Sequence, residues 1–343
     1  MKTPPTLTNS TPPKLIPTLL SGFNIVASNI FLIVLPILVD LALWLGPKIK
    51  LESLLLPQLT NLNTKLLNLE GPDLKSTLDA SQQMWTQILS NFNLEVTLRT
   101  FPIGIPSLVS REMFIDSPLG NGKPYQVPSF GIAFLLLFAF LLVGFFLGNY
   151  FFNMLSRYTA KPIEKISFNK LMAQFGQSLV MALILLIIIL ILLIPILLVL
   201  SLISIASGSI ADFILLIAIF VMLWMILPLV FSPHGVYVIN QKAFPSMLLS
   251  IRMIRFFLPG TGMFVVTAAL ISEGMNLVWT IPGSSSWLTL ISIFGHAFIV
   301  TALLTASFIY YREGLRWMQE AIQHMSAPMS TSGNGGPFGT TRQ

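Results

Sequence analysis

The sequence contains no cysteine and only three histidines, His234, His296 and His324. Without cysteine the chain forms no disulfide framework, thiolate metal site, cysteine nucleophile or cysteine-linked lipid anchor. Three histidines far apart in sequence do not supply the paired ligands of a zinc site, so we expect no metal and no cofactor. Motifs for nucleotide binding, serine hydrolysis and zinc hydrolysis are also missing, which argues against an enzyme and leaves no candidate catalytic residue.

Charged residues are scarce as well, at 9% of the 343 residues, whereas a soluble domain carries about 25%. Hydrophobic residues make up 54% of the chain, and its mean hydropathy is +0.81. The net charge of +6 comes from Lys and Arg residues spread along the chain, without the basic and aromatic stripe typical of nucleic-acid binding. We therefore expect a protein of the lipid bilayer with no nucleic-acid partner.

Six stretches are apolar enough for membrane-spanning helices, which need about 20 apolar residues each. They cover residues 23–45, 130–155, 179–205, 210–231, 256–281 and 287–311. The predicted fold class is all-α, a polytopic membrane protein with six transmembrane helices and an external amphipathic helical segment. The predicted parts are a Pro-rich cytosolic lead-in at 1–21, a first transmembrane helix at 22–47, an external segment at 48–128, five further helices at 129–312, and a largely disordered cytosolic tail at 313–343.

The distribution of Lys and Arg predicts which side of the membrane each loop faces. Basic residues gather in the loops after the second and fourth spans: Arg157, Lys161, Lys165, Lys170, Lys242, Arg252 and Arg255. The loops after the third and fifth spans contain none. Since short cytosolic loops are rich in Lys and Arg, we expect a multi-pass protein of the cell (plasma) membrane with both termini in the cytosol. The segment at 48–128 is long enough to be external despite its charges.

Two amphipathic helices are predicted within the external segment, at residues 55–69 and 78–92, separated by Gly71-Pro72. Two such helices cannot bury a core alone. They are expected to pack on the outer leaflet, on the protein's own bundle as a lid, or on a membrane-protein partner bound through residues 55–95. After them, the Pro- and Gly-rich sequence at 100–107 predicts an ordered re-entrant or surface turn.

Three ionisable residues stand out within the predicted spans: Asp40, Glu273 and His296. Charged groups are costly in lipid, so such residues are candidates for function, and the predicted topology puts all three within roughly 7 to 14 Å of the outer boundary. A converged cluster would bind a cation or relay protons. The alternative is that each forms separate polar contacts between helices. Asn149 and Asn153 are interpreted as helix-packing residues, through amide hydrogen bonds.

Two further places are predicted to make close contacts. Gly144 and Gly148 have the G-x-x-x-G spacing, which lets another backbone approach a helix, and we expect a contact within the chain. Arg252 and Arg255 belong to an amphipathic stretch that begins at Pro245. We expect these arginines to contact anionic lipid headgroups at the inner surface.

The C-terminal third carries several residues of a loosely defined pattern. They are Gly235 with the apolar Val236 to Ile239, Ala243, Ser250, Arg252, and the sequence Phe308-Ile309-Tyr310-Tyr311-Arg312-Glu313. On these residues the chain resembles uncharacterised bacterial polytopic families, including the membrane domain that accompanies some glycerophosphodiester phosphodiesterases. The resemblance implies a six-helix bundle with a cytosolic amphipathic helix before the fifth span. It implies no activity, because the catalytic barrel is missing.

The expected function follows from the scarcity of polar groups in the spans. We expect a non-enzymatic integral membrane protein, a structural or an assembly and anchoring component of a membrane complex. The alternative is a transporter or channel for a small ion or lipid-like solute, suggested by the three ionisable residues and by prolines that kink the spans. An enzyme ranks third, because the sequence does not place a catalytic acid and base within hydrogen-bond reach.

Overall fold

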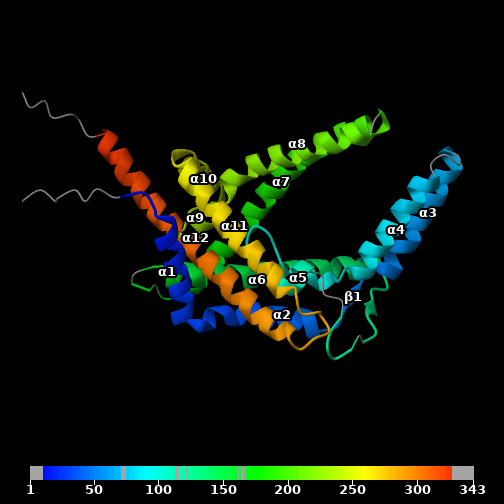
Figure 1. Ribbon diagram of the computed structural model, residues 1–343, viewed down its shortest axis with the longest axis horizontal. Coiled ribbons are helices and arrows are strands. Elements are labelled where there is room, and N and C mark those ends of the chain that lie inside the picture. Colours follow the sequence, from blue (N-terminus) through cyan, green and yellow to red (C-terminus); the bar gives the residue numbers. More distant parts are fainter. Residues whose placement is uncertain are drawn as a thin grey trace, which may run out of the picture.

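The computed structural model describes residues 11–70, 75–112, 116–120, 122–160, 162–163, 165, 167–206 and 208–326 (Figure 1). These residues are mostly helical, which confirms the all-α fold class. Five helices are long and apolar enough to cross a membrane, or six if the bent pair at the N-terminal end counts as one span. The chain is therefore a multi-pass membrane protein by the length and composition of its helices.

The described residues form twelve helices. They are α1 Leu15–Ser28, α2 Val34–Leu45, α3 Glu52–Glu70, α4 Lys75–Asn91, α5 Leu108–Glu112, α6 Phe130–Tyr158, α7 Phe168–Ala206, α8 Gly208–Ile226, α9 Ser232–Val238, α10 Ala243–Phe256, α11 Leu258–Trp279 and α12 Thr289–Ser326. Three 3-10 turns lie between them: η1 Ile30–Ile33, η3 Leu94–Leu98 and η4 Leu227–Leu229. Two short strands, β1 Ile49–Lys50 and β2 Tyr125–Gln126, pair in parallel and close the segment between α2 and α6.

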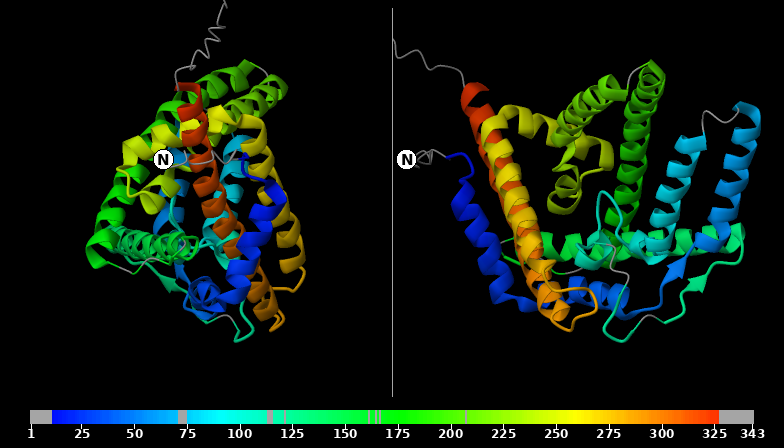
Figure 2. Two further views of the ribbon diagram at one scale, coloured as in Figure 1. Left: turned by 90° about the vertical axis from the view of Figure 1, so that its left-hand side faces the viewer. Right: turned by 45° about the vertical axis from the view of Figure 1, so that its right-hand side comes forward.

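The long helices form two groups that are joined through the middle of the molecule. Figures 1 and 2 show α11 alongside α12, with α1 packed on α12, while α7 and α8 form a separate antiparallel pair. α6 runs across the direction of both groups, and α3 and α4 form a hairpin that stands apart from them. Stacked aromatic rings tie α11 to α12, with the rings of Phe264 and Tyr310 only 4.3 Å apart between centroids.

The first predicted transmembrane helix, at 22–47, is two helices in the structure. α1 and α2 are inclined by 95° at the break between them. Asn29 leaves the helical region at the break, with φ −136° and ψ 64°, and its side-chain amide donates to the Ile25 carbonyl at 2.8 Å. An amide side chain that bonds the preceding turn competes with the helical backbone. Pro36 lies in the first turn of α2, where its missing N–H is tolerated, so it does not break that helix.

The remaining boundaries differ from the prediction mainly at the C-terminal side. The expected tail at 313–343 begins inside α12, which continues to Ser326 because Leu315 and Met318 still bury against the protein. Residues 327–343, like residues 1–10 of the lead-in, lie outside the described residues. The two external helices predicted at 55–69 and 78–92 are α3 and α4, and the break at Gly71-Pro72 also lies outside the described residues.

Candidate functional site

α5 is a five-residue helix whose first turn is held by a carboxylate from α2. Asp40 is fully buried and accepts a hydrogen bond from the Ser107 hydroxyl at 2.5 Å. It also accepts the backbone N–H groups of Leu108 and Val109, at 3.1 and 3.2 Å. These amides are the unpaired donors at the start of a helix, where a carboxylate is favourable. Asp40 therefore caps α5 from another helix.

The other end of α5 is tied to α11. Arg111 donates to both carboxylate oxygens of Glu273, one of these hydrogen bonds measuring 2.9 Å. Asn276 donates to Glu112 at 3.0 Å. The hydrogen bonds that Arg111 donates to Glu273 raise the pKa of Arg111 above its usual value. The Glu273 side chain is 57% exposed, so this bidentate pair lies at the surface of the protein.

His296, the third predicted residue, approaches the same place from α12. It is 4% exposed, and its Nδ1 atom has no hydrogen-bond partner in the described part of the chain. Its electrostatic neighbours are Arg111, Arg99 and Glu273. The structure thus gathers Asp40, Glu273 and His296 around α5 without a direct bond between any two of them. Among the described residues no three metal-ligating side chains form a group.

The sequence prediction missed two arginines at this junction, Arg111, which bonds to Glu273, and Arg99, which lies near the same carboxylates. Arg99 and Arg111 flank the Pro- and Gly-rich turn. The sequence prediction assigned no partner to either arginine. A sequence signal exists in retrospect, because a turn that enters the bundle between two basic residues brings their charges close to carboxylates in the spans. Only the three-dimensional arrangement shows that Arg111 pairs with Glu273.

A cavity of about 620 Å³ lies beside the junction, between residues 99–106, α11 and α12. Apolar side chains form most of its lining: Phe101, Ile105, Ala268, Val300, Leu303 and Leu304. Arg99 is the one charged residue in the described lining, and its side chain is exposed. Partial burial of its guanidinium, together with repulsion from Arg111, lowers the pKa of Arg99. Such a cavity is apolar with one cationic end.

A second cavity, of about 530 Å³, lies on the other side of the same turn. α7, α8 and the segment around η4 supply its walls, including Leu185, Trp224 and Leu227. Phe101 and Pro102 line both cavities, so the tip of the turn separates them. No charged residue among those that the structure describes lines this second cavity, which makes it suited to hydrocarbon.

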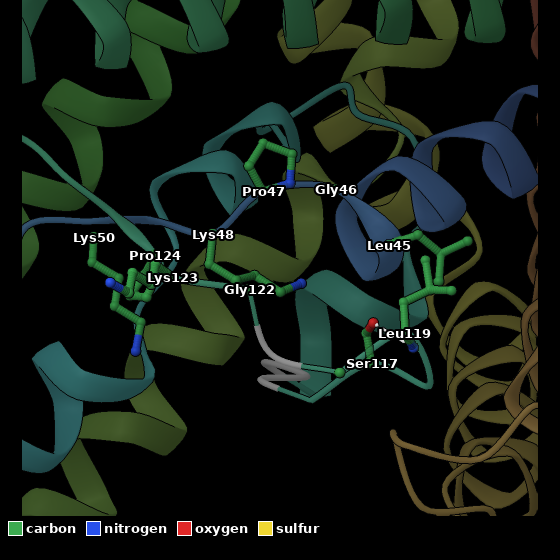
Figure 3. Close-up of a pocket in the computed structure, with 11 residues that line it drawn as sticks. Leu45, Gly46, Pro47, Lys48, Lys50, Ser117, Leu119, Gly122, Lys123 and Pro124 are labelled. Atoms are coloured by element: carbon green, nitrogen blue, oxygen red, sulfur yellow. Dashed lines mark hydrogen bonds between the residues drawn. The ribbon is translucent and has the colours of Figure 1, made fainter.

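A third cavity, of about 410 Å³, lies at the end of α2 and contains lysines (Figure 3). Lys48 donates to the Leu43 carbonyl and Lys50 to the Ser90 carbonyl, each at 2.6 Å. These carbonyls belong to the C-terminal turns of α2 and α4, where a cation is favourable. The two ammonium groups therefore stabilise helix ends, and we assign them a structural role.

The predicted glycine contact is made with the end of η3 and the turn after it rather than with another long helix. A Cβ atom on Gly144 would lie 2.3 Å from the Leu98 carbonyl oxygen, and one on Gly148 would lie 3.1 Å from the Gly104 Cα atom. Real Cβ atoms essentially never show the first distance, and the second is tighter than most real contacts, so backbone would have to shift at Gly144 and give slightly at Gly148. The two glycines of α6 thus let the segment leading into the turn pack against the helix, and they help to position the cavity walls.

Asn149 and Asn153 join helices through buried hydrogen bonds. Asn149 donates to the Leu171 carbonyl at 3.1 Å and accepts the Tyr237 hydroxyl at 2.9 Å. Asn153 donates to the Gln174 side chain at 2.6 Å. The bonds connect α6 with α7 and α9, and interhelical hydrogen bonds of this kind hold membrane helices together.

The arginines predicted to contact lipid lie on the exposed side of α10. Arg252 and Arg255 are exposed, whereas Met247, Met253 and Ile254 on the same helix are buried against the protein. The apolar side of α10 is therefore used for packing on the bundle. Contact of the two arginines with headgroups stays a prediction.

Comparison with family profiles, with curated proteins and with solved structures finds no match for this chain. The resemblance of its C-terminal third to bacterial polytopic families therefore stays a prediction. What the protein does is inferred below from its own residues.

Proposed function

We propose that this chain is a non-enzymatic component of a membrane complex that holds a partner protein through the α3–α4 hairpin. The observation that carries the proposal is an apolar face on this hairpin which no other described part of the chain covers. Figures 1 and 2 show the hairpin standing apart from the long helices. Hydrogen bonds attach the hairpin at its base, such as the one from Lys50 to the Ser90 carbonyl.

Polar side chains between the two helices set how they face each other. Asn63 of α3 donates to Gln82 of α4 at 2.8 Å, and Gln82 donates to Thr60 at 2.6 Å. Leu89 of α4 is buried. Asn63, Gln82 and Leu89 therefore mark the sides along which α3 and α4 meet.

Four apolar residues lie to one side of this contact and remain exposed. Their exposed fractions are 52% for Leu62, 36% for Leu66, 40% for Trp85 and 45% for Ile88. Leu62 directly precedes Asn63, and Ile88 directly precedes Leu89. Leu66 lies three positions after Asn63, and Trp85 lies three positions after Gln82. In an α-helix, a residue one position before a contact residue and a residue three positions after it point to the same side. In antiparallel helices these sides coincide, so the four residues form one apolar face.

A protein partner suits this face better than an anionic lipid surface. α3 and α4 contain three acidic and two basic residues, Glu52, Glu70, Asp79, Lys65 and Lys75. Helices that bind membrane surfaces are instead rich in Lys and Arg on their polar side. Exposed Trp, Leu and Ile with a polar rim are typical of the centre of a protein interface. A two-helix hairpin is also marginal in isolation, so a partner would stabilise it.

Site-directed crosslinking in the native membrane tests the proposal, and the absence of cysteine makes the chain suited to it. Trp85→Cys places a photo-crosslinker on the apolar face, and Gln83→Cys places one on the polar side of the same helix. We expect a discrete protein adduct from position 85 and none from position 83. Equal labelling from both positions, or adducts with lipid alone, would contradict the proposal. A second copy of the chain in the adduct would make the complex a homo-oligomer.

We further propose that the protein lies in the cell membrane with both termini in the cytosol, which the Lys and Arg distribution supports. Gln83→Cys in the hairpin and Gln319→Cys near the end of α12 test this orientation. A membrane-impermeant maleimide added to intact cells should label position 83 and leave position 319 unlabelled. The opposite pattern would invert the topology.

The alternative function is a transporter or channel for a small ion or lipid-like solute. The ion version has little support, because the oxygens of Asp40 are bonded to α5 and those of Glu273 to Arg111. The cavity beside Arg99 supports the lipid-like version. Movement of a fluorescent anionic lipid between the leaflets of reconstituted vesicles tests it, and unchanged rates with and without the protein would refute it.

A further inference from the structure

The two cavities on either side of the turn at Phe101-Pro102 have complementary properties. The cavity beside α11 and α12 has apolar walls and one charged residue, Arg99, whereas the cavity beside α7 and α8 is lined without charge. Each has a volume within the range of sites that enclose small ligands, about 300 to 1,000 Å³. Together they offer one cationic point and two apolar compartments separated by the turn.

Arg99 differs from Arg111 in having no bonded carboxylate within the described chain. Arg111 holds both oxygens of Glu273. Asp40 and Glu273 attract Arg99 from a distance, but their oxygens are already bonded to α5 and to Arg111. Within the part of the chain that the structure describes, the Arg99 guanidinium forms no hydrogen bond or ion pair. A partly enclosed guanidinium without a bound anion favours a ligand that brings one.

A buried polar atom next to this place points to a ligand independently. His296 lies one helical turn before Val300, which lines the cavity, and Arg99 is among its electrostatic neighbours. Its Nδ1 atom is buried without a partner in the described chain. Buried polar groups are nearly always hydrogen-bonded, so an unpaired one beside a cavity indicates a group from outside the described chain.

We propose that the two cavities bind one anionic lipid with two acyl chains, its phosphate on Arg99 and its chains on either side of Phe101-Pro102. The bidentate match between guanidinium and phosphate supplies the preference for an anionic headgroup. The apolar walls bury the acyl chains of a lipid, which a free phosphate ion does not have. The site is separate from the α3–α4 hairpin, so its failure would leave the proposed assembly function untouched.

Fluorescence quenching by brominated lipids tests the site in the purified full-length protein. Trp224 lines the second cavity, so an acyl chain bound there quenches it. The probes are phosphatidylglycerol and phosphatidylcholine, both brominated on the acyl chains and titrated into detergent-solubilised protein. We expect half-saturation with phosphatidylglycerol at a concentration at least tenfold lower, and loss of that quenching component in Trp224→Phe.

Variants of the charged residue separate this site from general attraction to anionic lipid. Arg99→Gln should remove the preference for phosphatidylglycerol, and Arg99→Lys should keep part of it. Arg316→Gln, an exposed arginine on α12 away from both cavities, is the matched control and should bind as the wild type does. Ala268→Phe fills the first cavity without changing any charge and should weaken binding of phosphatidylglycerol tenfold or more.

Three results would overturn the proposal. Equal affinities for the two lipids in the wild type would mean that no headgroup is selected. Equal losses of affinity for phosphatidylglycerol in Arg99→Gln and Arg316→Gln would mean that surface charge, not the cavity, attracts the lipid. Displacement of the brominated lipid by inorganic phosphate at the same concentration would make this a site for a free anion. Failure of inorganic phosphate to compete supports the lipid.

Discussion

Replacing Asp40 tests whether this buried carboxylate is a structural cap, as the structure indicates, or part of a transport site. In Asp40→Ala the Ser107 hydroxyl and the N–H groups of Leu108 and Val109 lose their acceptor. The residue is fully buried, so water does not simply replace the carboxylate. The start of α5 would be left with unsatisfied donors, and α2 would lose its polar contact with that helix.

The size of the effect follows from counting the groups left unpaired. Each buried donor without a partner costs about 1–3 kcal/mol, and neighbouring losses are not fully additive, so Asp40→Ala should lower the free energy of unfolding by about 3–5 kcal/mol. Asp40→Asn keeps one acceptor oxygen but points an amide at a donor, so it should cost about 1–2 kcal/mol. Ser107→Ala removes one donor and the hydroxyl that accepts from the Ser110 N–H at 3.0 Å, and it should cost about 1 kcal/mol.

Unfolding in mixed micelles, followed by tryptophan fluorescence, measures these differences. Asp79→Asn, an exposed carboxylate on α4, is the matched control and should unfold like the wild type. The reasoning is refuted if Asp40→Ala and Asp79→Asn are equally stable. It is also refuted if Asp40→Ala unfolds normally but abolishes a measured transport activity, since Asp40 would then act in function and not in stability.

Two further predictions concern packing and pH. Gly144→Ala places a methyl group against the Leu98 carbonyl and should destabilise the protein by about 1–3 kcal/mol, whereas Gly131→Ala, with open space around it, should be neutral or slightly stabilising in the same unfolding assay. Burial lowers the pKa of Lys48 from 10.5 in the fold. Between the lowered value and 10.5 the unfolded chain binds more protons, so stability should rise with pH in that window, and Lys48→Met should flatten the rise. A pH profile of unfolding that is identical in both proteins would contradict this assignment.

Most of the helices were predictable because their patterns are local. The apolar stretches of α6, α7, α8, α11 and α12 are long enough to be seen without any knowledge of their neighbours. α3 and α4 follow from leucine periodicity and from a Gly-Pro break. The bend after Ser28 was missed, because the sequence around Asn29 is as apolar as a continuous span and the bend depends on one amide.

The candidate site could be predicted only in part, because its organising element is short and held from a distance. α5 is five residues long and lies directly after a Pro- and Gly-rich turn, so no periodicity marks it. Its cap comes from a residue 67 positions earlier, and its ion pair joins residues 162 positions apart. Sequence reasoning selected Asp40, Glu273 and His296 from the cost of charge in lipid, and it had no means to assign their partners.

The position of α5 between residues far apart in the chain has a consequence for biogenesis. Asp40 is synthesised before the segment it caps, whereas Glu273 is synthesised 162 residues after Arg111. In a growing chain that has inserted its first helices, Asp40 can already cap the start of α5, but Arg111 at its other end does not yet have Glu273 as a partner. Arg111 gains this partner when α11 has been synthesised. Quality-control proteases that recognise unpaired charge near the bilayer would thus distinguish a chain that lacks its last two helices from a completed one.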